Sequence, residues 1–565
     1  MNLIGNINAI PFRRFRGGGG VTPIPPFPSI SGMIARYSAL GLTNEQMATN
    51  PVWVDKTGNG HDIQLKNFAW GGMSGVGGYV DNWNSSADWA VNSYWVNSHT
   101  DHKLQFITAS TVVQVKSKNV YNAENVYKNI LNVNGLTEAV NKGAVSSLEI
   151  FVTDSITSKV IKIFSFETDG VIQISFDDVL QDYYVNYFVM GNNTNDIDIT
   201  IEQLPLYPGA LVFDGIDDYG VCDNFPILTK EKGYTVVALR QWITRGEKAQ
   251  GLVSNVKNWL KDGAFLLEYR NIQADHLNKP ISFGAIGSEM DLPHILTYQT
   301  SKSYNGVSIT TGNFEGTDVL HVGKLAPTNV GTCINAAIWE LVFLDHDATE
   351  EELTKIKDYF VKTYPWLFPY QAWTVTGKTN EDEDRATIAN ITGNGNDLIL
   401  SNFGFIEGSG YNEEGEYAGY LVTDGVDDKA VSKQFKFGKN FTVILDFKFP
   451  VKKISYCGFD LSSKVGIRNL QDSGVYVVLK GNKTLIPSNV VRAVTSEGKV
   501  YDENWNEYNI VPGNISSNYT MVNLGFDGSN QFAESATKLA GIYSSTLSKD
   551  DCIKAYNYLQ TLKAK

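Results

Sequence analysis

Two clusters of aspartates are the first residues in this sequence that could do chemistry. They are Asp214, Asp217 and Asp218 in "DGIDD", and Asp424, Asp427 and Asp428 in "DGVDD". Calcium takes clustered carboxylate and backbone oxygens of this kind as ligands. An Asp-Gly pair between apolar runs is also a hairpin turn, in which the carboxylates accept backbone hydrogen bonds. Both interpretations of these clusters, a calcium site and a hairpin turn, therefore remain open, and the sequence indicates no other cofactor.

The other patterns with catalytic potential are weaker. "NEDEDR", residues 380–385, is rich in acids but lacks the alternation of a strand that presents two catalytic carboxylates to a glycan. His99 and His102 form a close pair without a third metal ligand nearby in sequence. No nucleophile elbow, phosphate-binding loop or dinucleotide fingerprint occurs in a strand-to-helix setting. These patterns predict that the chain is not an enzyme.

A polar, Asn-rich segment, "DNWNSSADWAVNSYW", contains four conspicuous aromatic residues. They are Trp83, Trp89, Tyr94 and Trp95. An aromatic ring offers an apolar face on which a sugar can stack, while Asn and Asp side chains fix its orientation by hydrogen bonds. Glycan binding is therefore one hypothesis for this segment. The alternative is that the rings fill a junction between two domains.

Length and charge limit the class of protein. At 565 residues the chain exceeds what one hydrophobic core supports, so we expect at least three domains. A net charge of -14 argues against nucleic acid as a partner, because phosphate contacts need clustered basic residues. No run approaches the ~18 apolar residues of a transmembrane helix, and the first residues do not resemble a secretory signal. We expect synthesis in a cytosol and no membrane insertion.

The four cysteines are sparse for this length and show no metal-binding spacing. We expect buried thiols. Pairing of Cys222 with Cys333, and of Cys457 with Cys552, remains open.

Internal repetition organises the chain. "TGNGHDIQLKNFAW" at residues 57–70 returns as "TGNGNDLILSNFGF" at 392–405, a spacing of 335 residues. "LVFDGIDDYGV" at 211–221 returns as "LVTDGVDDKAV" at 421–431, a spacing of only 210. Copy one therefore carries an insertion of 125 residues between its two landmarks. Each copy also ends in a strand-like run and a Thr- or Ser-capped amphipathic helix.

Short alternating runs such as "YTVVALRQW" and "FTVILDFKF", separated by Gly, Asn, Asp and Pro, predict antiparallel β-sandwiches. The insertion has the same pattern and predicts a β-sandwich of its own. The predicted domains are an N-terminal arm with a Pro-rich spacer (residues 1–30), a discontinuous jelly roll (31–75 and 206–368), an inserted β-sandwich (76–205) and a second jelly roll (369–565).

The N-terminal arm, "FRRFRGGGG" followed by "VTPIPPFPS", combines flexible glycines with a stiff proline-rich stretch. It contains two phenylalanines between three arginines, which offer apolar contact and positive charge to a partner. The predicted anchoring residues are Phe12, Arg13, Arg14, Phe15 and Arg16. A disordered terminus without a partner is the alternative.

Three landmarks that follow one another in the same order resemble the laminin-G-like, concanavalin A-like jelly rolls. The first is the turn "DKTGNGHDI", which returns as "ITGNGNDLI", and the second is "ALVFDGIDDYG", which returns as "YLVTDGVDDKA". The third is the closing strand and helix, "AAIWELVFLDHDATEEELTKI". The resemblance implies an all-β fold with two LamG-type jelly rolls, the first interrupted by the additional β-sandwich.

The glycine-rich arm and "IARYSALGLTNEQMATNPVWVDKTGNGHDI" resemble virion proteins of phages that infect gut Bacteroidales, including crAss-like phages. The resemblance implies a virion structural protein, either a head or tail fibre or a capsid decoration. It would be made in the host cytoplasm, joined to other virion proteins by its arm, homo-oligomeric, and exposed on the particle for attachment to host-surface glycans. The alternatives are a bacterial carbohydrate-binding protein and a glycan-degrading enzyme.

Overall fold

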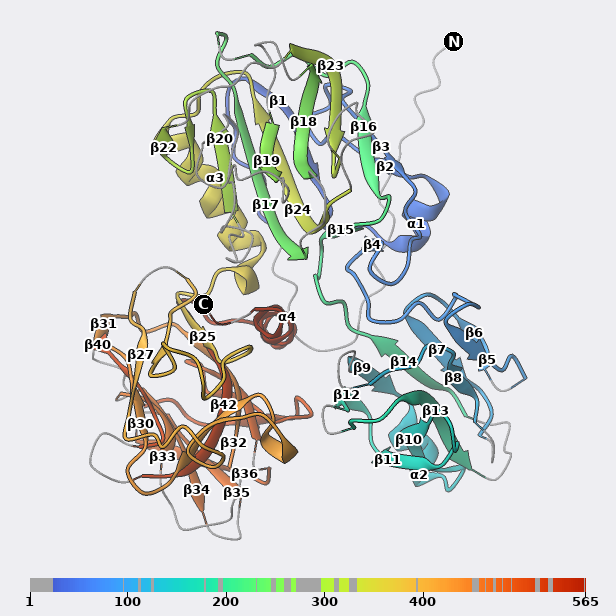
Figure 1. Cartoon of the computed structure of the whole chain (residues 1–565), viewed down its shortest axis with the longest axis vertical. Coiled ribbons are helices and arrows are strands. Elements are labelled where there is room, and N and C mark those ends of the chain that lie inside the picture. Colours follow the sequence, from blue (N-terminus) through green and yellow to red (C-terminus); the bar gives the residue numbers. More distant parts are fainter. Residues whose placement is uncertain are drawn as a thin grey trace.

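The fold is nearly all β, which confirms the predicted fold class. The computed structural model describes residues 24–565 except 95, 110–112, 123–126, 177–178, 192–196, 230, 245–249, 259–265, 271–295, 309–314, 325–332, 393–394, 450–456, 463, 471–473, 480, 489, 514–518, 527–531, 563 and 565. The predicted anchoring residues 12–16 and Trp95 lie outside the described residues. Figure 1 shows three β-rich lobes, and every strand pairing given below is antiparallel.

The first lobe consists of two sheets built from both sides of the insertion. Its eight-stranded sheet contains β1 (Met33–Ser38), β4 (Gly75–Val76), β15 (Leu211–Asp214), β17 (Thr235–Thr244), β20 (Leu296–Thr300), β21 (Ser303–Tyr304), β22 (Val307–Ser308) and β24 (Asn335–Leu344). Its six-stranded sheet contains β2 (Val52–Trp53), β3 (Ile63–Lys66), β16 (Tyr219–Cys222), β18 (Gln250–Asn258), β19 (Leu266–Arg270) and β23 (Glu315–Val322). Strand β15 pairs with β4, and β16 pairs with β3, so the chain returns to the same sheets after residue 210.

The second lobe consists of two five-stranded sheets. One contains β5 (Trp89–Val91), β8 (Val115–Ser117), β10 (Val145–Asp154), β11 (Val160–Phe166) and β13 (Tyr183–Gly191). The other contains β6 (Val96–His99), β7 (Lys103–Phe106), β9 (Lys128–Asn134), β12 (Gly170–Ser175) and β14 (Ile199–Gln203), and a short helix, α2 (Leu136–Asn141), follows β9. Alternating residues such as Leu131, Val133, Leu148 and Ile150 are fully buried in the core that these strands form.

The third lobe consists of two eight-stranded sheets. One contains β25 (Gln371–Thr374), β28 (Gly410–Asn412), β29 (Tyr420–Asp424), β32 (Thr442–Lys448), β37 (Val490–Thr495), β38 (Lys499–Tyr501), β39 (Glu507–Asn509) and β42 (Glu534–Tyr543). The other contains β26 (Thr387–Ile388), β27 (Leu398–Ser401), β30 (Lys429–Val431), β33 (Cys457–Leu461), β34 (Val465–Leu470), β35 (Gly474–Leu479), β36 (Asn482–Ile486) and β41 (Val522–Leu524). A separate pair joins β31 (Phe435–Lys436) to β40 (Tyr519–Thr520). The exact domain boundaries stay a prediction.

The repeated sequence landmarks make equivalent hydrogen bonds in both copies. In copy one the backbone N–H of Asp55 donates to Asp62 Oδ1 at 2.8 Å. In copy two the N–H of Asn390 donates to Asp397 Oδ1 at 2.7 Å. The repeated stretch that follows Asp55 is therefore a folding signal, because in both copies an aspartate seven residues further along closes the same turn.

Helices close both repeats, as the sequence predicts. They are α3 (Glu350–Thr363), which is followed by the 3-10 helix η3 (Pro365–Leu367), and α4 (Lys549–Gln560); the remaining short helices are α1 (Asn44–Thr49) and η4 (Gly415–Tyr417). Thr349 caps α3 through Oγ1, which accepts the N–H of Glu352 at 3.3 Å, and Ser548 caps α4 by accepting from Asp551 at 3.1 Å. Of the described cysteines, Cys222, Cys333 and Cys552 are buried free thiols.

A buried ion pair lies where α4 meets the third lobe. Arg492 of β37 pairs with Asp446 of β32, and their side chains are 11% and 3% exposed. Tyr556 and Gln560 of α4 donate to Asp446 Oδ2 at 3.1 and 2.9 Å. Burial would raise the pKa of Asp446, but the Arg492 charge and these hydrogen bonds lower it below its usual range.

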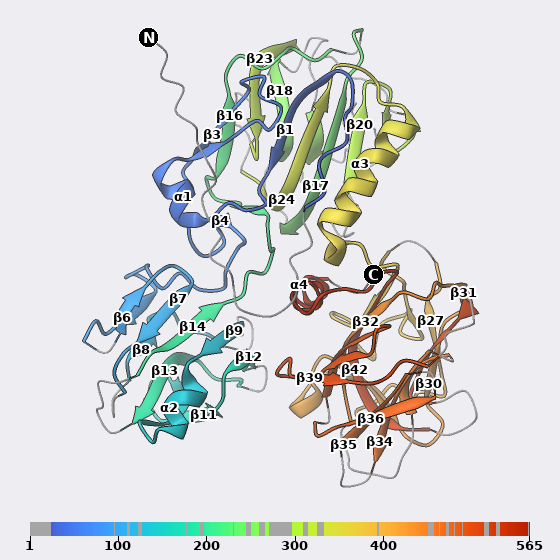
Figure 2. The same ribbon diagram turned by 180° about the vertical axis from the view of Figure 1, so that it is seen from behind.

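The same network connects the third lobe to the second. The Tyr556 hydroxyl lies 2.8 Å from Oε1 of Gln173, a residue of β12, and Arg492 donates to that oxygen at 3.4 Å. Figures 1 and 2 both show α4 near the centre of the molecule, between the three lobes. The Asp446 carboxylate is therefore the anchor of a junction that joins sequence-distant segments.

Asp446→Asn is expected to lower the free energy of unfolding by about 3–5 kcal/mol, because it leaves the Arg492 charge buried without its counter-ion. Denaturant unfolding of the full chain at pH 7, monitored by tyrosine and tryptophan fluorescence, measures the change. The contribution is present above the unfolded carboxyl pKa of about 4 and is lost as the pH falls below it. The control is Glu497→Gln, which removes an exposed acid and should change stability by less than about 0.5 kcal/mol. Equal effects of the two substitutions would contradict the proposed role of the pair.

Candidate functional site

A cavity of about 410 Å³ opens between the first and second lobes. One wall is the hairpin that connects β15 to β16, and the others come from the loops around residues 69–74, 80–89 and 119–121. The lining residues are Ala69, Gly71, Gly72, Met73, Ser74, Val80, Asp81, Asn82, Ser85, Asp88, Trp89, Asn119, Tyr121, Asp214 and Ile216. Its volume lies within the range of about 300–1,000 Å³ that is usual for small-molecule sites.

The lining combines rings, amides and acids. Trp89 and Tyr121 supply aromatic surface, and Asn119 donates to Asp88 Oδ1 at 3.0 Å across the rim. No lysine or arginine is among the described residues that line this cavity. The site can therefore accept hydrogen bonds from a ligand and pack against its apolar face.

Asp81 is a nearly buried carboxylate in the cavity wall. It is 2% exposed, and its Oδ2 accepts from the Tyr127 hydroxyl at 2.5 Å and from Asn129 Nδ2 at 2.9 Å. Burial raises the pKa of Asp81 to about 7, although these two hydrogen bonds oppose the shift; the nearby Asp88 charge adds to it. Asp81 therefore changes protonation near neutral pH.

Trp83 and Trp89 correct the expectation that both rings are exposed to a glycan. They are 1% and 3% exposed and pack edge-on against Tyr187 at 5.7 and 5.9 Å between ring centroids. Both rings lie in the core of the second lobe, Trp89 as an inward-facing residue of β5 and Trp83 from a turn that precedes this strand. Of the two, only Trp89 reaches the cavity wall. Tyr94 is 76% exposed and does not line the cavity.

Sequence reasoning did not single out Asp81 or Tyr121. Asp81 is the first residue of the Asn-rich segment "DNWNSS", so its position in a polar loop was visible. Its burial depends on Tyr127 and Asn129, which lie more than 40 residues further along the chain. No local sequence pattern predicts such a contact.

The two aspartate clusters form hairpin turns that match each other. Asp214 Oδ1 accepts the N–H of Ile216 at 2.7 Å, and Asp424 Oδ1 accepts the N–H of Val426 at 2.8 Å. In copy one, Asp218 uses both oxygens, since Oδ1 accepts from Ser74 at 3.0 Å and Oδ2 accepts the Asp214 N–H at 3.0 Å.

These carboxylates also have the proximity that a cation would need. In each cluster one oxygen from every aspartate lies within 4.8 Å of the others. Burial, followed by the charge of Asp214, raises the pKa of Asp218 to about 7, and burial raises that of Asp428 to about 6. The hydrogen bonds account for the hairpin, and calcium binding stays a prediction.

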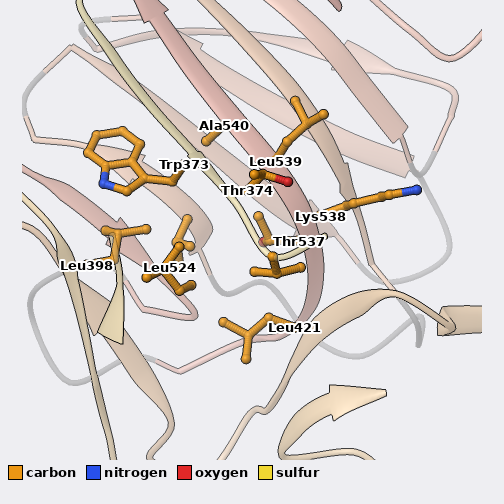
Figure 3. Close-up of a pocket in the computed structure, with 11 residues that line it drawn as sticks. Trp373, Thr374, Leu398, Leu421, Leu524, Thr537, Lys538, Leu539 and Ala540 are labelled. Carbon is orange, nitrogen blue, oxygen red and sulfur yellow. The ribbon is translucent and has the colours of Figure 1, made fainter. Parts of the chain in front are cut away.

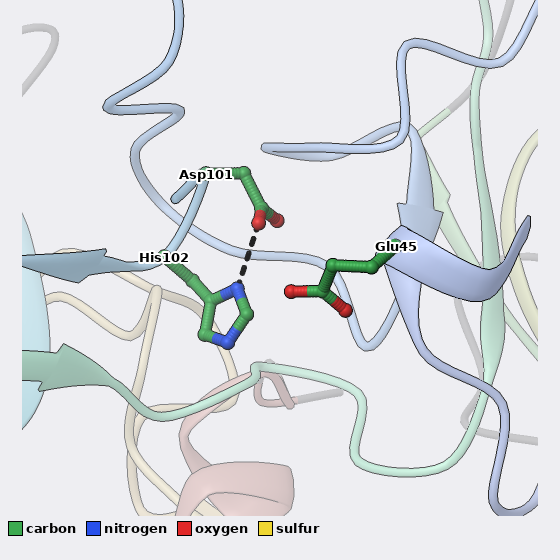
Figure 4. Close-up of side chains that lie close together, drawn as sticks. All are labelled: Glu45, Asp101 and His102. Carbon is green, nitrogen blue, oxygen red and sulfur yellow. Dashed lines mark hydrogen bonds and ion pairs between the residues drawn. The ribbon is translucent and has the colours of Figure 1, made fainter. Parts of the chain in front are cut away.

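A second titratable cluster lies where α1 approaches β7 and β14. Asp101 accepts from His102 Nδ1 at 2.8 Å and from Asn44 at 2.8 Å, and Glu45 lies beside this pair (Figure 4). The His102 ring stacks on Tyr79 with centroids 4.6 Å apart. The fold places His102 at a contact between lobes, whereas His99 is exposed.

The pKa of His102 is raised above its usual value. Burial lowers it, but the hydrogen bond and charge of Asp101, with the charges of Glu202 and Glu45, outweigh burial. Glu202 Oε1 lies 3.9 Å from His102 Nε2. Carboxylates of both lobes therefore favour the protonated ring, Asp101 and Glu202 from the second lobe and Glu45 from the first.

A small cavity inside the third lobe is not a ligand site. Figure 3 shows its lining of core side chains, among them Trp373, Leu398, Leu421 and Leu524. Its volume of about 10 Å³ holds one water molecule at most.

Among the described helices, none is long and apolar enough to cross a membrane.

No protein-family model and no curated protein matches the chain. Solved structures with a remote likeness include the binding domain of Paraclostridial Mosquitocidal Protein 1 (13% identity, TM-score 0.22) and the botulinum neurotoxin serotype D binding domain (12%, 0.24). Each match covers 33% of this chain and 51% of the other, so the chain spans about half the length of these two structures. Trypanosoma rangeli sialidase matches at 10% identity and TM-score 0.25, over 82% of this chain and 83% of that chain.

The sialidases correct one prediction. Because enzymes are among the matched structures, the expectation that the chain is not an enzyme is withdrawn. At 10% identity and a TM-score of 0.25 the likeness assigns no activity to this chain.

His102→Gln is expected to destabilise the chain by about 1.5–3 kcal/mol at pH 5.5, because the variant loses a charged hydrogen bond to Asp101. A raised folded-state pKa means that this contribution is fully present below the unfolded value of about 6.5 and is lost as the pH rises through the folded pKa. Denaturant unfolding at pH 5.5 and 8.5 should therefore give a larger difference between wild type and variant at the lower pH. His99→Gln is the control and should show no such difference; a pH-independent effect of His102→Gln would refute the assignment.

Proposed function

We propose that this chain binds a glycan in the cavity between its first and second lobes. The observation that carries the proposal is the cavity itself, which combines about 410 Å³ of space with the ring of Tyr121 and the polar side chains of Asn82, Ser85 and Asn119. Sugar hydroxyls can pair with such amides and hydroxyls, while sugar C–H groups pack against a ring.

We further propose that the chain is a phage virion structural protein, a fibre or a capsid decoration, that presents this cavity to host-surface glycans. The support is the resemblance of its sequence landmarks and the predicted arm at residues 1–30, where residues 12–16 combine aromatic and basic side chains. The arm would bind other virion proteins, and homo-oligomerisation is part of the same proposal. A bacterial carbohydrate-binding protein is the alternative without a particle.

A glycan-degrading enzyme is the second candidate, because three carboxylates line the cavity. They belong to Asp81, Asp88 and Asp214. A carboxyl group with a pKa near 7, as at Asp81, is suited to proton transfer at neutral pH. Release of reducing sugar from host polysaccharide by the purified chain would favour this candidate.

Tyr121→Ala is expected to weaken glycan binding at least tenfold, because it removes an aromatic wall of the cavity. A glycan array followed by calorimetry on the best-bound oligosaccharide measures the loss. The matched control is Tyr94→Ala, which removes an aromatic side chain outside the cavity lining and should leave affinity unchanged. A loss with Tyr94→Ala but not with Tyr121→Ala would move the site to the loop at residues 92–94.

Deletion of residues 1–22 is expected to leave the chain folded and to abolish its incorporation into particles, as measured by mass spectrometry of purified virions. The deletion should stop before Phe27, because the Phe27 ring packs on Tyr359 at 4.8 Å and beneath the Arg36 guanidinium at 4.2 Å. The control is the full-length chain expressed at the same level. Normal incorporation of the truncated chain would rule out the arm as an anchor, and absence of the full-length chain from particles would rule out the virion role.

A further inference from the structure

One oxygen of Asp81 has no hydrogen-bond partner within the described part of the chain. Oδ1 is buried and unbonded, whereas Oδ2 accepts from Tyr127 and Asn129. A buried carboxylate oxygen without a partner is costly, so native structures normally supply one. Asp81 is one of the residues that line the cavity, so a donor that reaches Oδ1 from the cavity side would satisfy this oxygen.

The rest of Asp81 is held firmly in place. Its N–H donates to Gln203 Oε1 at 2.9 Å, and its carbonyl oxygen accepts from Gln203 Nε2 at 3.1 Å. Asn129 also donates to Gln203 Oε1 at 3.0 Å, so the surrounding groups fix one another. Oδ1 is therefore a preorganised acceptor, which reduces the entropy that a ligand would lose on binding.

Charge determines the class of glycan that this acceptor can take. The carboxylates of Asp81, Asp88 and Asp214 line the cavity, and no basic side chain is among its described lining residues. The nearby Lys118 ammonium donates to the Ser86 carbonyl on the outer surface. An acidic sugar would add a negative charge to this set, and like charges at close range in a partly desolvated site repel one another. Sialylated, sulfated and uronic-acid glycans are therefore disfavoured.

We propose that the cavity binds a neutral, hydroxyl-rich glycan and that one sugar hydroxyl donates its hydrogen bond to Asp81 Oδ1. This inference rests on the proposed glycan-binding function and adds the ligand class and the residue that recognises it. The aromatic wall at Tyr121 is available to the apolar face of the same sugar. Selectivity against acidic sugars then comes from the carboxylates of the lining rather than from shape.

The protonation of Asp81 gives this contact a pH dependence. An ionised carboxylate accepts a hydroxyl hydrogen bond more strongly than a carboxylic acid does, so affinity should rise between pH 6 and 8. The titratable groups that face Asp81 are Asp88, Tyr121, Tyr127 and Tyr187. Burial raises the pKa of all three tyrosines well above this range, so they remain protonated throughout.

The test uses the full chain on an array of neutral oligosaccharides (glucose-, galactose-, mannose- and N-acetylglucosamine-terminated) beside sialylated, sulfated and uronic-acid oligosaccharides. We expect binding to neutral members only. Calorimetry with the best-bound neutral oligosaccharide should then show an affinity that increases from pH 6 to pH 8. Asp81→Asn should weaken binding at least tenfold at pH 8 and remove the pH dependence.

A second variant keeps the test decisive if Asp81→Asn fails to fold. Tyr127→Phe removes a hydrogen bond that lowers the Asp81 pKa without changing the cavity lining, so the pH midpoint of binding should move upward. An unchanged midpoint, preferred binding of acidic glycans, or unchanged affinity of a folded Asp81→Asn chain would each overturn the inference while leaving glycan binding intact. Failure to bind any oligosaccharide on the array would overturn the proposed function, and the inference with it.

Discussion

The buried carboxylate of Asp446 is the constraint on which the arrangement of the lobes depends. A charge at this depth is tolerated only when an opposite charge and hydrogen bonds replace the water that it has lost. Arg492, Tyr556 and Gln560 meet that requirement from β37 and α4, and Tyr556 extends the network to Gln173 of the second lobe. The closing helix and the third lobe must therefore assemble together to satisfy this side chain, and Gln173 of the inserted lobe joins the network through Tyr556 and Arg492.

Asp81 is also buried, but its pKa shifts in the opposite direction to that of Asp446. It is as deeply buried as Asp446, yet its partners are neutral hydroxyl and amide groups, and no arginine or lysine contributes to its pKa shift. Burial then dominates and the pKa rises to about 7, whereas the Arg492 charge drives that of Asp446 down. A fully paired carboxylate holds structure together; a carboxylate that is only half bonded beside a cavity remains available to a ligand.

The features that could be predicted from sequence are those fixed by near neighbours in the chain. The alternation of apolar and polar residues predicted the β class. The Thr349 cap lies three residues from its partner Glu352, and the Asp214 carboxylate accepts its hydrogen bond from the N–H of Ile216, two residues away. Trp83 was misjudged because a polar flanking sequence does not reveal which way a ring points. The proximity of Glu45 to His102 requires two lobes to meet, and nothing local to either residue encodes it.

Comparison of the two repeats explains how a structural hairpin became part of a binding cavity. In both copies the Asp-Gly turn carries an exposed aliphatic residue at its tip, Ile216 at 77% and Val426 at 70% exposure. In copy two the chain passes from β28 to β29 within eight residues, so no inserted lobe follows the first landmark. In copy one the insertion places the loops of a second lobe opposite Ile216, which thereby lines the cavity. The repeated motif supplies one wall, and the insertion supplies Asp81 and most of the polar side chains of the lining.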